Sequence, residues 1–375
     1  MSTASQSRPR MVFHAPFPLN RKATSASGIR PVRMRDAFEA LGYEVWEVTG
    51  TARQRAAASR RVRHALKAGL RFDFCYSESS TMPTSMTEAH HLPLHPLLDF
   101  QLFRALRARG CRVGLFYRDI YWAFDGYGEG LNPVKKAAAL AAYRYDLKAY
   151  DRTVDVLYLP SMLMAPHVDV QRVRMAALPP GHDMPELEPQ PAEGIHLFYV
   201  GGLGDHYRFP VLLQAVQQVA ASGRPVSLTL CTHQSQWEQN KQDYQAFVGG
   251  PVRVVHANGP ELEPLYRAAN ATTLFIEPND YRAFASPVKL YEYVGQAKPV
   301  LASEGTLSGR FVDENGFGWT VPYTLEAVTA KLTELADHPE EVQRVREVMV
   351  QRRGEHSWLQ RARGVAEELS GSVPA

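Results

Sequence analysis

The chain has 375 residues, of which 45% are hydrophobic and 22% are charged, and its formal net charge is +3 at pH 7. This length favours two domains, and the composition is that of an ordinary globular protein. The small net charge gives no support to nucleic-acid binding. No apolar run reaches the roughly 18 residues that a membrane-spanning helix requires, and the polar start "MSTASQSRPR" lacks the apolar core of a signal peptide.

Cysteine usage points to a reducing compartment. The three cysteines lie far apart in the sequence, and each sits in or beside an apolar run. This usage predicts buried, reduced thiols in a cytoplasmic protein rather than a disulfide framework. The residues concerned are Cys75, Cys111 and Cys231.

Short apolar strand candidates alternate with longer amphipathic patterns in the first half of the chain. Helical patterns cover 30–41 and 97–109. The strand candidates span 10–17, 43–49, 71–77, 112–118 and 154–160. This alternation predicts βαβ units and a parallel sheet that is covered on both faces. The series ends at 178–194, where a proline-rich, acidic stretch without periodicity is typical of a linker.

The same alternation begins again after the linker. Helical patterns cover 208–222 and 325–354. The strand candidates span 195–204, 226–232, 252–257, 271–278 and 299–303. We therefore expect an α/β fold of two Rossmann-like domains that face each other across a cleft, because ligands bind at the carboxyl ends of parallel strands. The expected boundaries are 1–180 for the first domain, 181–194 for the linker, 195–355 for the second domain, and 356–375 for a helix that crosses back to the first.

The stretch "SPVKLYEYVGQAKPV" (286–300) places a lysine and a glutamate one turn apart at the start of a predicted helix. Ser286 suits the N-cap and Pro287 suits the first helical position. The amides of a helix N-terminus, together with Lys289 in the first turn, suit a phosphate. One turn later, Glu292 is placed to accept hydrogen bonds from the hydroxyls of a ribose. A surface ion pair between the two residues, contributing about 0.3 kcal/mol, is the alternative.

A second phosphate-suited turn is "YVGGLG" (199–204), which follows the first strand of the second half. Gly201 and Gly202 leave room for the backbone to approach a phosphate, although many strand–helix turns need glycine for geometry alone. The full G-x-G-x-x-G spacing is absent, so a nicotinamide or flavin site is not supported. Two such turns in one half of the chain favour a nucleoside diphosphate as ligand.

Several runs resemble nucleotide-sugar-dependent glycosyltransferases of the GT-B fold, over nearly the whole chain. They are "FYVGGLG", "GPELEPLYRAANATTLFIEP" and "SPVKLYEYVGQAKPVLAS". The last run is similar to a pattern found in bacterial, family-four-like transferases that build surface glycans. The resemblance implies that Lys289 binds the donor diphosphate, that Glu292 binds the donor ribose, and that Ser286 lies at the donor site. It also implies that Gly201 and Gly202 form the turn beneath the phosphates.

The resemblance carries further expectations about the ligand. It implies that the strand end from His256 to Gly259 lies near the base of a donor such as a UDP-sugar, with no cofactor beyond that donor and no metal. Two positions depart from the family pattern. Phe284 stands where many retaining members carry a second glutamate, so their donor-sugar contact and a retaining outcome are not implied. Ala297 stands where glycine usually ends the helix, and a left-handed alanine there costs about 1 kcal/mol.

Candidate acceptor-side residues follow strands of the first half. Asp119, after the strand at 112–118, suits the general base of an inverting transfer, and inverting enzymes similar to the xanthan glucuronosyltransferase place an aspartate base in this domain. Capping of the next turn, or pairing with Arg118, are the alternatives for Asp119. Glu78 follows another strand and is a second candidate on the acceptor side. The alternative is that it belongs to a polar loop with local backbone hydrogen bonds.

Three other segments of the first half have open interpretations. The loop 20–34 follows the first strand, where Gly28 and Arg30 could shape a donor or acceptor pocket, and a disordered loop is the alternative. His91 and His95 have the spacing of a helical zinc pair, but nearby prolines predict a loop. The basic helical run 53–71 is either a solvated face or a peripheral contact with anionic lipid at the inner face of the membrane.

The leading functional hypothesis is a glycosyltransferase that moves a sugar from a nucleotide-diphosphate donor to a glycan or lipid-linked acceptor in bacterial polysaccharide synthesis. A nucleotide-sugar 2-epimerase would use the same two-domain fold, but it needs acid and base groups around the sugar, and no clear set appears. A nucleotide-sugar-binding module without catalysis is the non-enzymatic alternative, since Phe284 replaces a family carboxylate.

Overall fold

The computed structural model describes residues 8–23, 25–124, 127–204, 208–280, 282–371 and 373. The chain divides into two compact units. Unit 1 contains residues 1–179 and 358–375, and unit 2 contains residues 180–357. Each unit has a hydrophobic core of its own, and each is a parallel α/β layer structure.

The sheet of unit 1 has six strands in the order β2-β1-β3-β4-β5-β6. Every neighbouring pair is parallel. The strands are β1 (Arg10–His14), β2 (Glu44–Val48), β3 (Phe74–Glu78), β4 (Arg112–Phe116), β5 (Val156–Leu159) and β6 (Arg174–Ala177). The order reverses between β1 and β3, and open parallel sheets bind ligands outside the carboxyl ends of the strands at such a reversal.

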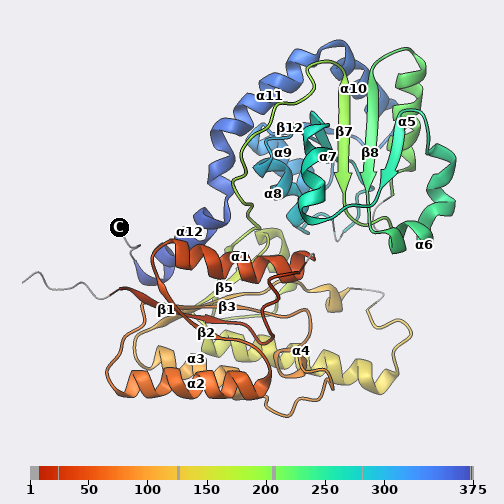
Figure 1. Ribbon diagram of the computed structural model, residues 1–375. Helices are drawn as coiled ribbons and strands as arrows, with labels where there is room; N and C mark the ends of the chain where they lie inside the picture. The colour runs from red at the N-terminus through yellow and green to blue at the C-terminus, as the bar shows by residue number, and fades with distance from the viewer. Residues whose placement is uncertain are drawn as a thin grey trace, which may run out of the picture. The chain divides into compact units, whose positions relative to one another are not determined.

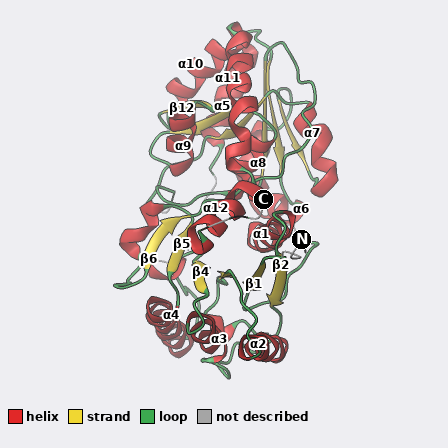
Figure 2. Ribbon diagram, turned by 90° about the vertical axis from the view of Figure 1, so that its left-hand side faces the viewer, coloured by secondary structure: helices red, strands yellow, loops and turns green. Residues whose placement is uncertain are grey.

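Helices cover both faces of this sheet (Figures 1 and 2). One face carries α1 (Ala26–Ala40) and the C-terminal α12 (Trp358–Ser370). The other face carries α2 (Ala52–Lys67), α3 (Leu98–Arg107) and α4 (Pro133–Thr153). The apolar side of α12 is buried in the core of unit 1, where the helix packs on α1, β3 and β4.

The sheet of unit 2 also has six parallel strands, in the order β12-β11-β10-β7-β8-β9. The strands are β7 (Ile195–Val200), β8 (Val226–Cys231), β9 (Val252–Val255), β10 (Ala271–Leu274), β11 (Val300–Ser303) and β12 (Gly318–Val321). Counted from β7, this is the strand order of dinucleotide-binding Rossmann sheets, whose ligand lies where the order reverses. In unit 2 that point lies between β7 and β10.

The helices of unit 2 follow its strands in regular alternation. They are α5 (Pro210–Ala221), α6 (Gln234–Tyr244), α7 (Glu263–Arg267), α8 (Val288–Gly295), α9 (Leu307–Asn315), α10 (Leu325–Asp337) and α11 (Pro339–Arg352). Short 3-10 helices occupy Thr84–Met86, Tyr121–Ala123, Met162–His167, Gln245–Phe247, Gly259–Leu262 and Arg353–His356. None of the described helices combines the length and the apolar character that a bilayer crossing requires.

The parallel α/β prediction is confirmed for both halves of the chain, and all three cysteines are buried free thiols as predicted. Two strands were not predicted. Both β6 and β12 lie at sheet edges, contain four residues each, and are only partly buried. An edge strand needs no continuous apolar run, so the pattern that marks a central strand is missing there.

Candidate functional site

The two phosphate-suited turns of unit 2 lie side by side at the reversal of strand order. Lys289, in the first turn of α8, donates from Nζ to the hydroxyl of Tyr199 over 2.8 Å. The Tyr199 hydroxyl donates to the carbonyl oxygen of Gly202 over 2.8 Å. A Cβ atom on Gly201 would lie 2.2 Å from Lys289 Nζ. Only glycine therefore lets the ammonium group rest directly over the turn that follows β7.

The start of α8 corrects one prediction. The N-cap is Pro287, with φ −74° and ψ 134°, and no side chain caps the helix. Ser286 therefore stands one residue too early to cap, and its Oγ lies 3.2 Å from the hydroxyl of Tyr291. A bound anion is one of the ways in which N–H groups of a helix start are satisfied.

The buried face of α8 fixes the direction of the helix. Leu290, Tyr291 and Val294 are buried. The amide of Val200, the last residue of β7, donates to the hydroxyl of Tyr293 over 3.0 Å. This bond joins α8 to the strand end that carries the glycine turn, so the position of Lys289 relative to that turn is held from two sides.

Glu292 lies one turn after Lys289 and is half-buried. It lies near Tyr266 of α7. Burial raises the pKa of the Tyr266 phenol above its ordinary value, and the Glu292 carboxylate raises it further. A half-buried carboxylate at this edge of the sheet is suited to accept hydrogen bonds from ligand hydroxyls.

The other predicted donor-side positions lie in unit 2 as follows. His256 is exposed after β9, and its Nδ1 donates to the carbonyl oxygen of Thr232 over 2.8 Å. Phe284 is 5% exposed and belongs to the packing of the unit. Ala297 has a φ of 47°, so α8 ends in the left-handed conformation that usually calls for glycine, with alanine in its place.

Two residues near the turn were not singled out from the sequence. Tyr199 connects Lys289 to Gly202, but it lies on a buried strand and its apolar surroundings conceal the role of its hydroxyl. Arg208, just before α5, forms an ion pair with Glu277 after β10, with Nη1 and Oε2 separated by 3.3 Å. Its partner lies far away in the sequence, so no local pattern marks the pair.

In unit 1, Arg30, Glu78 and Arg118 form a buried charged cluster. Arg30 Nε lies 3.1 Å from Glu78 Oε1, and Arg118 Nη2 lies 3.5 Å from Glu78 Oε2. The Tyr76 hydroxyl donates to Glu78 Oε1 over 2.6 Å, and the Arg30 guanidinium stacks 3.4 Å from the centroid of the Phe116 ring. The cluster contains two arginines and one carboxylate, and burial lowers the pKa of Arg118.

This cluster changes the roles predicted for two residues. Arg30 lies inside α1 and not in a loop, and its side chain is 4% exposed. Glu78 is the last residue of β3 and its side chain is 0% exposed, so the polar-loop alternative is wrong. Neither residue lines the cavity beside Arg118. Glu78 pairs with the Arg118 guanidinium, and Arg30 pairs with Glu78.

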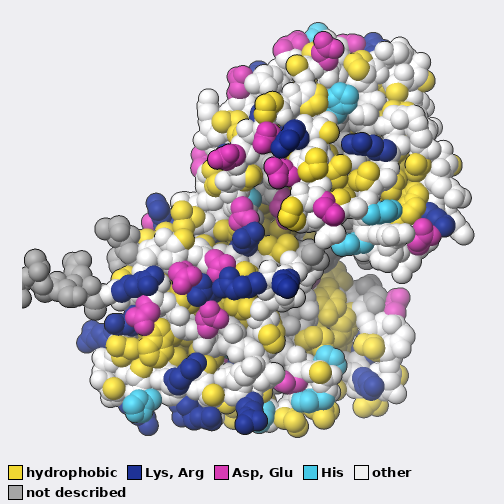
Figure 3. Space-filling model, in the orientation of Figure 1, with side chains coloured by type: hydrophobic (Ala, Val, Ile, Leu, Met, Phe, Trp, Pro, Cys, Tyr) yellow, Lys and Arg dark blue, Asp and Glu magenta, His cyan; other side chains and the backbone are white. Residues whose placement is uncertain are grey.

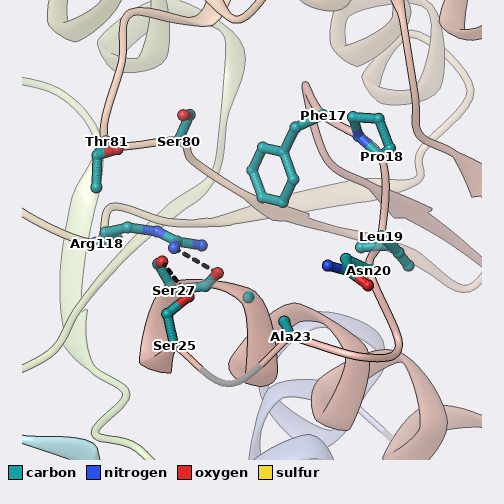
Figure 4. Close-up of a pocket in the computed structure, with 11 residues that line it drawn as sticks. Phe17, Pro18, Leu19, Asn20, Ala23, Ser25, Ser27, Ser80, Thr81 and Arg118 are labelled. Atoms are coloured by element: carbon teal, nitrogen blue, oxygen red, sulfur yellow. Dashed lines mark hydrogen bonds between the residues drawn. The ribbon is translucent and has the colours of Figure 1, made fainter. Parts of the chain in front are cut away.

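Arg118 lines a cavity of about 270 Å³ at the reversal of strand order in unit 1 (Figure 4). Its Nη1 donates to the Ser27 carbonyl oxygen over 2.7 Å, and its Nε donates to the Ser79 carbonyl oxygen over 3.0 Å. A Cβ atom on Gly28 would lie 2.4 Å from that of Ala23, so the loop after β1 folds closely over α1. The lining consists of Phe17, Pro18, Leu19, Asn20, Ala23, Ser25, Ser27, Gly28, Ser80, Thr81 and Arg118.

Asp119 follows β4 and is partly buried. Its Oδ1 accepts hydrogen bonds from the amides of Ile120 and Tyr121, over 2.7 and 3.0 Å. The capping contact that the sequence left open is therefore present, and the amides fix the carboxylate at the carboxyl end of the strand. His91 and His95 lie in a loop, as predicted. Among the described residues, no group of three or more His, Cys, Asp or Glu could hold a metal ion.

No family model and no curated sequence matches this chain. Solved structures resemble it at low sequence identity. Sucrose-phosphate synthase from Thermosynechococcus elongatus has a TM-score of 0.62 at 13% identity, covering 96% of this chain and 98% of that one. Anabaena HepE in complex with UDP-glucose has a TM-score of 0.61 at 10% identity, covering 97% and 100%.

A glycosyltransferase from Rickettsia africae has a TM-score of 0.59 at 11% identity, covering 96% of this chain and 98% of that one. Identities this low inform on the fold alone. The chain therefore has the fold of these structures, two parallel α/β units with flanking helices, which is the GT-B fold expected from the sequence.

Proposed function

We propose that the protein is a glycosyltransferase that moves a sugar from a nucleotide-diphosphate donor, such as a UDP-sugar, to a glycan or lipid-linked acceptor. The observation that carries this proposal is the ammonium group of Lys289 resting over the Gly201 turn. A full positive charge, a side-chain-free turn and an uncapped helix start meet at the strand reversal of unit 2. HepE, which resembles this chain in fold, binds UDP and UDP-glucose.

On the donor side, Lys289 binds the diphosphate and the turn at Gly201 and Gly202 lies beneath it. Ser286 contributes to the same helix start, Glu292 accepts from the ribose hydroxyls, and His256 lies toward the base. The positive charge of Lys289 and the amides of α8 stabilise the negative charge that the diphosphate gains as it leaves. We propose on this ground that transfer needs no metal and no resident cofactor.

On the acceptor side, unit 1 binds the acceptor in the cavity next to Arg118 and Gly28. Asp119 takes the proton of the attacking hydroxyl as the new bond to the anomeric carbon forms. The bond from that carbon to the diphosphate oxygen breaks, and the diphosphate leaves with the electron pair. Glu78 acts as a positioning residue, because it contacts Arg118 and does not line the cavity, and Arg30 in turn holds Glu78. Such a reaction inverts the anomeric centre.

The resemblance to surface-glycan transferases supports bacterial polysaccharide or glycoconjugate synthesis as the setting, on the cytoplasmic side of the membrane. A lipid-linked acceptor would make peripheral membrane contact useful, and the basic run 53–71 is the segment that suits it.

A donor panel tests the proposal. The purified chain is incubated with uridine, guanosine and other nucleotide sugars, with and without oligosaccharide acceptors, and nucleoside diphosphate release is measured by chromatography. We expect slow hydrolysis of one donor, and faster release when an acceptor is present. Interconversion of the sugar without release would identify a 2-epimerase. Saturable donor binding with neither reaction would identify a binding module and overturn the proposal.

A further inference from the structure

The outward face of α2 is strongly cationic. Its exposed charged side chains are Arg53, Arg60, Arg61, Arg63 and Lys67, and the helix contains no Asp or Glu. Figure 3 shows Lys and Arg side chains gathered along α2 at the lower edge of the view. Arg55 belongs to the same run but is 2% exposed, because its guanidinium pairs with the buried Asp99, with Nε and Oδ1 2.9 Å apart.

These cations have few carboxylate partners near them. Among the residues that the structure describes, no ion pair involves Arg60, Arg61 or Arg63. The net charge of the chain is only +3, so the positive charge without ion-pair partners on this helix face is a local concentration. Such a face attracts polyanions, and the attraction is screened by salt.

An exposed leucine loop, residues 91–97 ("HLPLHPL"), lies beside the start of this helix. All seven of these residues are exposed, and Leu92, Leu94 and Leu97 are 55%, 62% and 47% exposed. Leu92 and Leu94 line one hollow together with Arg53 at the first turn of α2. The leucine loop therefore adjoins the cationic helix at its first turn, at Arg53. Proline at two positions of the loop keeps it out of regular secondary structure.

The same side of unit 1 carries further apolar residues from α4. Tyr145 is 39% exposed, and its hydroxyl donates to the carbonyl oxygen of Pro96 in the leucine loop over 3.4 Å. Both α2 and α4 cover the face of the sheet opposite α1 and α12 (Figures 1 and 2). Leucines that protrude next to arginines are costly in water unless an apolar phase covers them.

We propose that this surface docks the protein on an anionic phospholipid bilayer. The leucine loop enters the acyl boundary, while the arginines of α2 contact the phosphates of the headgroups. A nucleic acid would match the charge but would leave the leucines in water, so the bilayer is the partner that satisfies both observations. A lipid-linked acceptor at this membrane is part of the proposed function. The docking on the bilayer does not depend on sugar transfer.

The test measures binding of the full chain to large vesicles by sedimentation. Vesicles of phosphatidylcholine alone are compared with vesicles that also contain phosphatidylglycerol. We expect binding only to the anionic vesicles. The double variant Arg60→Gln, Arg63→Gln should bind about 25-fold more weakly, at about fivefold for each charge. The double variant Leu92→Ser, Leu94→Ser should bind at least about tenfold more weakly.

A matched control removes two exposed arginines from unit 2, in the variant Arg310→Gln, Arg344→Gln. It should bind the anionic vesicles as the wild type does. Donor hydrolysis in solution should be unchanged in all three variants, because none of the altered residues belongs to the donor or acceptor site. Vesicle binding by a wild type that hydrolyses no donor would contradict the transferase proposal but not the docking.

Several results would overturn the docking proposal. One is failure of the wild type to bind anionic vesicles, and another is a loss of vesicle binding in the control variant that equals the loss in the arginine variant. Binding to a single-stranded oligonucleotide without binding to vesicles is the third such result. Weaker binding on removal of the arginines but not of the leucines would show surface adsorption and overturn insertion of the loop.

Discussion

A single methyl group at Gly201 tests the donor site, because the Cβ of alanine would lie 2.2 Å from Lys289 Nζ and 2.9 Å from the Tyr199 hydroxyl. The ammonium group must move away from the turn. We expect Gly201→Ala and Lys289→Ala each to weaken UDP binding by about 1.5–3 kcal/mol, the range of a hydrogen bond to a charged group. Isothermal titration calorimetry measures the affinity.

Gly204→Ala provides the matched control for this pair. A Cβ there meets nothing within 4 Å, so UDP affinity should stay at the wild-type value. Unchanged UDP binding by folded Lys289→Ala would show that the lysine does not contact the diphosphate.

Replacing one carboxylate oxygen of Asp119 by an amide nitrogen distinguishes a general base from a capping residue. In Asp119→Asn the amide oxygen still accepts from the Ile120 and Tyr121 amides, so the turn after β4 should stay intact. A general base would be lost, and we expect turnover to fall about 100-fold or more with donor affinity nearly unchanged. Steady-state kinetics at varied donor concentration separates the two effects. Near-normal turnover would leave Asp119 with its capping role alone.

At the scale of residues, a contact could be predicted only when its partners lie close together in the sequence. Lys289, Glu292 and the two glycines belong to short patterns whose chemistry is legible within a few residues. The contact of Tyr199 with Lys289 spans about ninety positions, so only the fold reveals it. The sequence places Arg30 at the overlap of the loop 20–34 and the helical pattern 30–41, because the polar residues before it hide the start of α1 at Ala26. Its burial against Glu78 depends on β3, which lies far away in the sequence.

At the level of elements, the left-handed end of α8 offers a stability test. Ala297 has a φ of 47° and is 0% exposed. Ala297→Gly removes about 1 kcal/mol of backbone strain. It also removes a methyl group whose burial stabilises the fold by about 0.8 kcal/mol. Its free energy of unfolding should therefore stay within about 1 kcal/mol of the wild type. Ala297→Val should lower it by about 3 kcal/mol, since a branched side chain suits neither the backbone nor the packed site.

Denaturant unfolding followed by tryptophan fluorescence measures both variants. If valine is tolerated as well as glycine, the backbone at this position is not left-handed in solution. The outcome bears on the site, because the turn at Ala297 ends the helix that carries Lys289.

Central strands could be predicted because burial on both faces leaves continuous apolar runs, as in β7 and β8. The edge strands β6 and β12 lack such runs and became visible only through their neighbours. The cap of α8 was predicted one residue too early, because serine followed by proline fits the usual order of a helix start while Pro287 is itself the extended residue. Local rules locate elements well and their ends less well.

For the molecule as a whole, the two units should respond to pH in opposite ways. In unit 1, burial raises the pKa of Asp146 from 3.8 to about 7. Between these values the folded state holds a proton that the unfolded state releases, so this contribution to stability is full below pH 3.8 and is lost as the pH rises towards 7. In unit 2, burial lowers the pKa of Lys298 from 10.5 to about 7, and Arg346 adds to the shift.

For Lys298 the unfolded state holds the extra proton, so stability rises with pH between about 7 and 10.5. Asp146→Asn should flatten the fall in unfolding free energy below pH 7, and Lys298→Met should flatten the rise above it. Each slope is at most about 1.4 kcal/mol per pH unit. Denaturant unfolding at pH 5, 7 and 9 measures the slopes. A wild-type slope in either variant would show that the altered group does not titrate in that range.

The path of the chain through the two units has a consequence for biosynthesis. The core of unit 1 needs α12, yet 178 residues that form unit 2, from Pro180 to Ser357, are translated before that helix. On the ribosome, unit 2 can therefore complete its folding before unit 1. The apolar surface of unit 1 that α12 covers stays exposed until the C-terminal residues are translated. A nascent chain with such a delay is an expected client of chaperones.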